Sequence, residues 1–131
     1  MFQRFAAASA IASMALGLAA LILLVSSGLS FQRFYPVTIM WCVVPLVWGL
    51  WAMIAPHTWV PQRLPWWGAM LGLIAGLFLL FVLNLPSRVF GETVPTLLRA
   101  VGVLVLAVFY YLLWILVRLA HRALAAGPSS N

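Results

Sequence analysis

Acidic residues and lysine are almost missing from this 131-residue sequence. It has no Lys and no Asp, its one acid is Glu92, and charged residues make up 6% of the chain, against about 25% in soluble domains. Cysteine is equally scarce, and the lone Cys42 permits no internal disulfide. A hydrophobic content of 66% leaves too little polar surface for a soluble fold and excludes a disordered chain. The composition therefore predicts a protein that resides in a membrane.

Positive charge is present, but it is scattered. Seven arginines give a net charge of +6, and they stand singly at positions 4, 33, 63, 88, 99, 118 and 122. A nucleic-acid interface needs a clustered basic patch, so this spacing excludes nucleic acid as an expected partner. Single arginines between apolar runs are typical of side chains that anchor helices at lipid phosphates. The expected partners are therefore the lipid bilayer, with anionic lipid headgroups, and other membrane protein subunits or further copies of this chain.

Four apolar runs are each long enough for a helix of about 20 residues, the length that crosses a bilayer. They predict transmembrane helices at about 5–29, 37–55, 66–85 and 97–120, followed by a flexible tail at 124–131. The runs are too long and too uniformly apolar for the strands of a membrane barrel. Short connections make consecutive helices antiparallel neighbours. The predicted fold is an all-α membrane protein, a single integral membrane domain over 1–131 with four transmembrane helices in an up-down-up-down bundle.

The run at 5–29 has a second interpretation, as a cleaved signal peptide that begins after the basic Arg4. Its length exceeds the apolar region of about 7–15 residues found in such peptides, which favours an uncleaved helix. Both termini and the second connection then share one side, with four arginines against three on the other. The positive-inside rule places that side in the cytoplasm. We expect a bacterial cytoplasmic membrane protein with cytoplasmic N- and C-termini.

Tryptophan and arginine gather at the predicted span ends, as is typical of side chains that hold a helix at the membrane interface. The expected interface anchors are Arg4, Arg33, Arg63, Arg118, Arg122, Trp59, Trp66 and Trp67. Deeper aromatic residues, among them Tyr110, Tyr111 and Trp114, either pack inside the bundle or line a site for a flat apolar ligand. The tetrapeptide Phe-Gln-Arg-Phe occurs at 2–5 and 31–34. Its shortness favours a repeated interfacial pattern over internal duplication.

Small residues recur at helical spacing in two of the predicted spans. Gly68, Gly72 and Gly76 share one helix face, and Ser9, Ser13 and Gly17 form a second stripe. In lipid, this spacing lets two backbones approach closely, so that dispersion drives their association. Both stripes lie in the same half of the bilayer, and we expect them to contact each other. Self-association through either stripe is the alternative.

Few polar or helix-bending residues fall inside the runs. Pro45 stands near the middle of the second run and is expected to bend its helix. Asn84 lies near the end of the third run, where it is expected to cap a helix or bond to a neighbouring one, with a role in a solute pore as the alternative. Glu92, between Arg88 and Arg99, is expected to form an interfacial ion pair.

Catalytic and cofactor chemistry has little support in these residues. We expect no metal and no cofactor, because no phosphate, dinucleotide or zinc motif is present and His57 and His121 do not face each other from neighbouring spans. No ionisable residue lies at mid-span, which disfavours ion-coupled transport. The predicted function is non-enzymatic: a structural, accessory or assembly subunit of a membrane complex. The alternative is a small oligomeric pore or facilitator for a small solute, and the third is a lipid-acting membrane enzyme, which a single acid disfavours.

Overall fold

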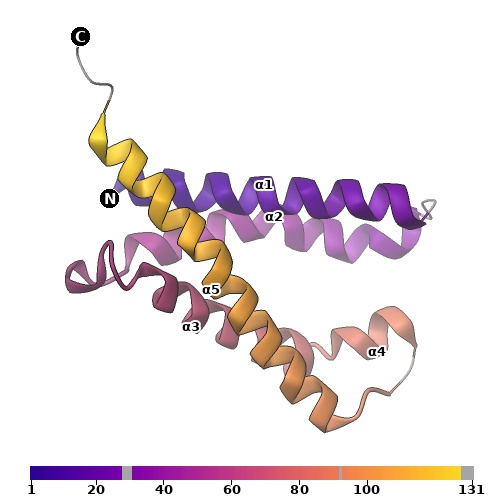
Figure 1. Ribbon diagram of the computed structural model, residues 1–131. Coiled ribbons are helices and arrows are strands. Elements are labelled where there is room, and N and C mark those ends of the chain that lie inside the picture. The colour runs from indigo at the N-terminus through magenta and orange to yellow at the C-terminus, as the bar shows by residue number, and fades with distance from the viewer. Residues whose placement is uncertain (28–30, 92, 128–131) are drawn as a thin grey trace. The chain divides into compact units, whose positions relative to one another are not determined.

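The computed structural model describes residues 1–27, 31–91 and 93–127, and every element within these ranges is a helix (Figure 1). The helices are α1 (Phe2–Ser27), α2 (Phe31–Met53), η1 (His57–Trp59), α3 (Leu64–Leu77), η2 (Phe78–Val82), α4 (Leu85–Phe90) and α5 (Thr96–Ala126). The chain divides into two compact units. Unit 1 contains Met1–Ala55 and Leu119–Asn131, and unit 2 contains Pro56–Arg118.

Among the described residues, three helices are long and apolar enough to cross a membrane. They are Phe2–Ile22, Leu64–Val82 and Thr96–Ala126, and α2 adds a shorter apolar helix at Cys42–Met53. These lengths and compositions support an integral membrane protein. They confirm the predicted helical class with long apolar spans.

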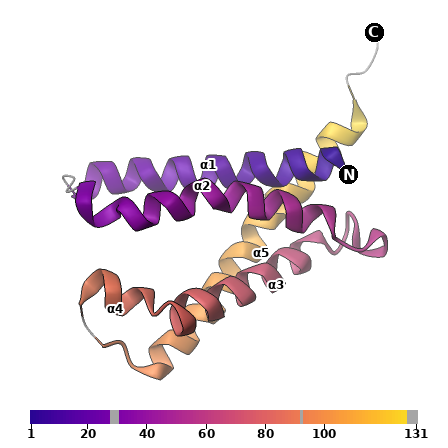
Figure 2. The same ribbon diagram turned by 180° about the vertical axis from the view of Figure 1, so that it is seen from behind.

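In unit 1, α1 and α2 lie side by side and antiparallel, as two opposite views agree (Figures 1 and 2). The Ser9 hydroxyl on α1 donates a hydrogen bond of 2.9 Å to the Pro45 carbonyl on α2. A Cβ placed on Gly49 would lie 2.5 Å from the Phe5 ring and 2.6 Å from Ser9 Oγ, so only a glycine fits there. At the end of the pair, Arg4 Nη1 donates to the Ala55 carbonyl at 3.3 Å. This pairing agrees with the expectation that consecutive helices are antiparallel neighbours.

Helix α2 begins earlier than the sequence predicted. It starts at Phe31 instead of residue 37, so residues 31–36, which the prediction left between two spans, are helical. Pro36, a residue type that often marks a helix boundary, lies inside α2. A proline this close to a helix start removes only one backbone hydrogen bond, and helices in membranes tolerate that loss.

In unit 2, α3 continues without a break into the π-helical turn η2 and ends at Asn84, whose backbone is left-handed with a φ of 47°. The short helix α4 follows at Leu85–Phe90 and ends at Gly91, where φ is 72°. The stretch between the third and fourth predicted spans therefore begins with most of a short helix. Proline at the first turn favours this helix start, because its missing N–H has no intrahelical partner there.

Helix α5 runs to Ala126, beyond the predicted end near residue 120 and into the first residues of the predicted tail. Its 31 residues span about 46 Å at 1.5 Å per residue. A bilayer core is about 30 Å thick, so α5 is longer than a perpendicular crossing requires. The residues near its C-terminal end include Arg118, His121 and Arg122, which suit the polar side of an interface.

Candidate functional site

Residues 56–63, which precede α3, form a compact turn that leads into the start of that helix. The Trp59 N–H donates to the Pro56 carbonyl at 2.9 Å, and the Arg63 N–H donates to the Trp59 carbonyl at 2.8 Å. Arg63 is the residue that caps α3, and its side chain is exposed. Pro65 stands within the first turn of α3, a position that favours helix initiation. The turn therefore fixes Arg63 at one end of a span-length helix.

The glycine face of α3 packs against α5, and the two helices run antiparallel. A Cβ on Gly68 would overlap Trp114, a Cβ on Gly72 would lie 2.7 Å from Tyr110 Cβ, and one on Gly76 would lie 3.2 Å from Val103 Cα. Successive glycines along α3 thus meet successively earlier residues of α5. All three glycines and Trp114 are buried. This is the stripe of small residues that the sequence offered as a candidate packing face.

The helix that occupies the glycine face was not the expected one. The predicted partner was the stripe of Ser9, Ser13 and Gly17, whereas the structure places α5 on Gly68, Gly72 and Gly76. Within the first stripe, Ser9 bonds to α2, while Ser13 and Gly17 are exposed and a Cβ on Gly17 would meet nothing within 4 Å. Small residues permit a close approach from any helix. The large side chains of α5 fill the space that the glycines leave.

Beside the glycine contact, α3 and α5 enclose an open groove of about 550 Å³ that we call the α3–α5 groove. Its α3 wall consists of Trp66, Ala69, Met70 and Leu73, and its α5 wall of Ala107, Val108 and Tyr111. The Trp66 and Tyr111 rings meet edge to face at 5.2 Å and form one end of the groove lining. This volume is within the range of about 300–1,000 Å³ that is typical of small-molecule sites.

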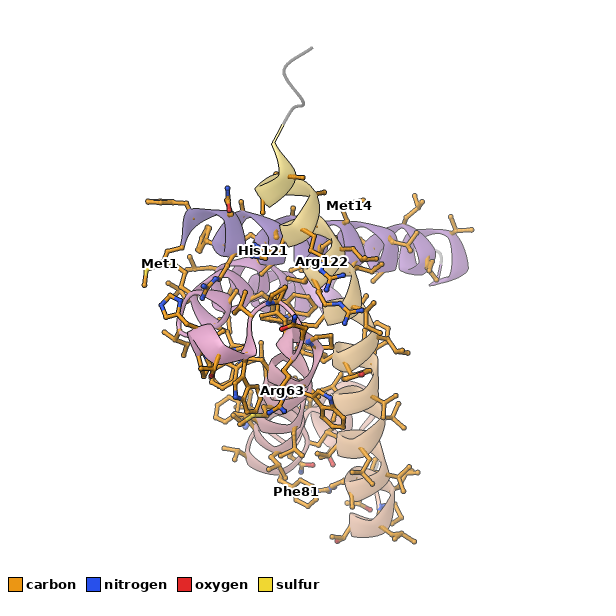
Figure 3. All side chains as sticks on the ribbon, turned by 60° about the vertical axis from the view of Figure 1, so that its left-hand side comes forward. Met1, Met14, Arg63, Phe81, His121 and Arg122 are labelled. Atoms are coloured by element: carbon orange, nitrogen blue, oxygen red, sulfur yellow. The ribbon has the colours of Figure 1, made fainter. Side chains whose placement is uncertain are left out.

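A second, smaller hollow of about 410 Å³ adjoins the groove. It is lined by Trp59, Arg63, Trp66 and Met70, and it shares Trp66 and Met70 with the groove. The Trp59 ring is held edge to face against Trp67 at 5.9 Å. The two hollows therefore combine an apolar channel with a cationic opening. Figure 3 labels Arg63 at the start of this helical run and Phe81 near its other end.

The other predicted residues serve helix ends and helix contacts where the structure describes them. The Asn84 side-chain oxygen accepts a hydrogen bond of 3.0 Å from the Ser87 hydroxyl, but it makes no capping bond to a backbone N–H of α4. Pro45 lies within a continuous α2, and its carbonyl accepts the bond from Ser9. Arg118 is half-buried and Arg122 is exposed. Glu92 and the side chain of Arg33 lie outside the described residues.

Sequence reasoning missed Gly49, Met70 and Leu73. Gly49 stood alone on its helix, without the four-residue repeat that identified the α3 stripe. Met70 and Leu73 look like ordinary lipid-facing residues, and only their spacing from Trp66 marks them as one face. Tyr111 and Trp114 were expected either to pack or to line an apolar site. Trp114 does the first and Tyr111 the second.

Comparisons with protein-family models, with curated proteins and with solved structures found no match to this chain. Among the described residues, His, Cys, Asp and Glu side chains form no group of three that could hold a metal ion. The features that remain for a functional argument are the two close helix contacts and the α3–α5 groove with its opening at Arg63.

Proposed function

We propose that this chain is a non-enzymatic structural or accessory subunit of a membrane complex. The observation that carries the proposal is that two polar side chains of the predicted spans, Ser9 and Asn84, bond to other groups of the chain. The Ser9 hydroxyl donates a hydrogen bond to the Pro45 carbonyl, and the Asn84 side-chain oxygen accepts one from the Ser87 hydroxyl. A pore needs such groups to face a passing solute. Here they strengthen the helix pair and a helix start instead.

The exposed surface of α5 supports association with another membrane protein. Large apolar side chains stand on it at helical spacing outside the α3–α5 groove, among them Leu97, Val101, Leu104 and Leu112. Such a face is compatible with lipid and equally with a partner helix, since both are apolar. We further propose a four-span arrangement in a bacterial cytoplasmic membrane, with the ends that carry Arg4 and Arg122 in the cytoplasm.

Affinity purification in a mild detergent tests the subunit proposal. The full chain, tagged and expressed at its native level, is expected to retain one or a few membrane proteins in a fixed ratio. Crosslinking before solubilisation, followed by mass spectrometry, is expected to join them to α5. The matched variant is Leu104→Asn, which changes an exposed side chain on α5 and leaves the glycine contact intact.

Two outcomes contradict the proposal. The first is recovery of the chain alone both from crosslinked and from untreated membranes. The second is a specific increase in solute permeability when the purified chain is reconstituted by itself in liposomes. That increase would favour the small oligomeric pore, and Asn84→Ala is then expected to change its selectivity.

A further inference from the structure

We propose that the α3–α5 groove is a binding site for one anionic phospholipid, whose phosphate pairs with Arg63 and whose acyl chain lies between α3 and α5. The site goes beyond the proposed subunit function and does not depend on it. The first observation is that the groove and the opening at Arg63 are continuous through Trp66 and Met70. A phospholipid is likewise one molecule with a charged end and an apolar end.

The depth of the groove fits the position of a lipid in one leaflet. Arg63 precedes the span Leu64–Val82, so it lies at an interface when that span crosses the bilayer. Leu73, at the inner end of the groove, is ten residues further along, about 15 Å at the rise of an α-helix. That is about half of a 30 Å core. The groove therefore descends from the headgroup region to the middle of the bilayer.

The charge at the opening selects an anion. Arg63 is exposed, and the described part of the chain contains no Asp or Glu to neutralise it, since Glu92 lies outside it. A guanidinium binds phosphate oxygens through paired N–H donors. Trp59 and Trp66 flank the same opening, and indole rings favour the headgroup level of a bilayer. A zwitterionic lipid offers the same phosphate beside a cation that Arg63 repels.

The apolar walls are open enough to admit a chain. Trp66, Met70, Leu73 and Val108 are 42–61% exposed. Trp66 and Tyr111 meet edge to face at the end of the groove nearer Arg63, where the acyl chain would join the headgroup. The backs of these walls are fixed by the packing of Gly72 against Tyr110. The groove is thus present before the lipid arrives, which lowers the entropic cost of binding.

Native mass spectrometry of the full chain in a mild detergent tests the site. The probes are phosphatidylglycerol and phosphatidylcholine with identical acyl chains. We expect one phosphatidylglycerol to be retained about fivefold more strongly than phosphatidylcholine, as one basic group near an anionic lipid supports. Arg63→Gln is expected to remove this preference. Arg122→Gln, which changes another exposed arginine that lines neither hollow, is expected to keep it.

A second matched pair of variants tests the part of the proposal that places the acyl chain in the groove. Val108→Trp fills the groove and is expected to weaken retention of both lipids at least threefold, by a loss of apolar contact. Val105→Trp makes the same change at an equally exposed position outside the groove lining, and it is expected to leave retention unchanged. Both variants alter exposed side chains.

Equal retention of the two lipids by the wild-type chain overturns the proposal, because the bound lipid is then only bulk annular lipid. So does Arg63→Gln behaving like Arg122→Gln. If Val108→Trp converts a dimer to a monomer without affecting lipid retention, a second copy occupies the groove and the lipid assignment is wrong. The site can also be tested on the wild-type chain. Phosphatidylglycerol with a photoactivatable acyl chain is expected to label residues 66–73 and 107–111. Labelling that avoids these segments overturns the site.

Discussion

A single methyl group at Gly68 tests the close contact between α3 and α5. A Cβ at this position would overlap Cβ, Cγ and Cδ1 of Trp114, which are atoms at the root of that side chain. Trp114 is completely buried, so the indole has no free space into which it can move. Overpacking of a filled interior lowers the free energy of unfolding by about 1–3 kcal/mol. Replacing glycine by alanine in a helix raises it by about 0.5–1 kcal/mol. We expect Gly68→Ala to lower the free energy of unfolding by about 1–2 kcal/mol.

The remaining glycines provide graded controls for the same substitution. At Gly72 the nearest atom to a new Cβ is 2.7 Å away, and at Gly76 it is 3.2 Å away, so each alanine is easier to accommodate than the one before. At Gly17 nothing lies within 4 Å. Gly17→Ala is therefore expected to leave stability unchanged or to raise it by up to about 1 kcal/mol. From the least to the most stable variant, the expected order is Gly68→Ala, Gly72→Ala, Gly76→Ala and then Gly17→Ala.

The assay unfolds the purified chain in mixed micelles by increasing the proportion of denaturing detergent. Far-UV circular dichroism monitors the loss of helix. Trp114→Ala is expected to destabilise the chain by itself, since it empties the space beside Gly68. In the double variant the added methyl group has room, so the two changes are expected to couple by more than about 0.5 kcal/mol. Equal stability of Gly68→Ala and Gly17→Ala, or strict additivity with Trp114→Ala, would refute the packing argument.

Three further expectations concern unit 1 and the end of α3. Ser9→Ala removes the 2.9 Å bond to the Pro45 carbonyl and is expected to cost about 0.6 kcal/mol of unfolding free energy in the same assay, whereas Ser13→Ala, at an exposed position, is expected to cost nothing. Gly49→Leu forces the Phe5 ring away and is expected to lower stability by about 1–3 kcal/mol, so a variant as stable as the wild type contradicts the α1–α2 contact. Asn84→Gly keeps the left-handed backbone and is expected to be near neutral, while a β-branched Asn84→Val is expected to cost about 1–2 kcal/mol and to speed amide exchange in α4.

Composition and run length were enough to predict the helical class and the apolar spans, because the bilayer demands about 20 apolar residues whatever the fold. Helix boundaries at proline were less predictable. Pro56 and Pro65 lie next to helix ends, while Pro36 and Pro45 lie within α2. A proline either ends a helix or lies within it. The outcome depends on whether neighbouring groups satisfy the backbone carbonyl four residues earlier, which loses its hydrogen bond. That information lies in the tertiary contacts and is absent from a local pattern.

The groove was beyond the reach of sequence reasoning for a related reason. Trp66, Met70 and Leu73 mark one face of α3, but every side of a membrane helix is apolar, so the pattern does not separate a groove wall from a lipid-facing surface. The α5 wall is more than thirty residues away in the sequence. Its register against α3 decides whether Tyr111 meets Trp66 or points elsewhere. The glycine contact sets that register.

The glycine stripe and the groove are therefore consequences of one alignment. Spacing alone treats Ser9, Ser13 and Gly17 as equivalent to Gly68, Gly72 and Gly76, yet Ser13 and Gly17 are exposed while all three α3 glycines are buried. The difference lies in the facing helix, where Trp114, Tyr110 and Val103 decrease in size as the overlap with a built Cβ decreases. In this antiparallel register the largest of the three side chains, Trp114, faces Gly68. The same register brings Tyr111 to Trp66, so a variant that shifts the glycine contact by one turn is expected to close the α3–α5 groove as well.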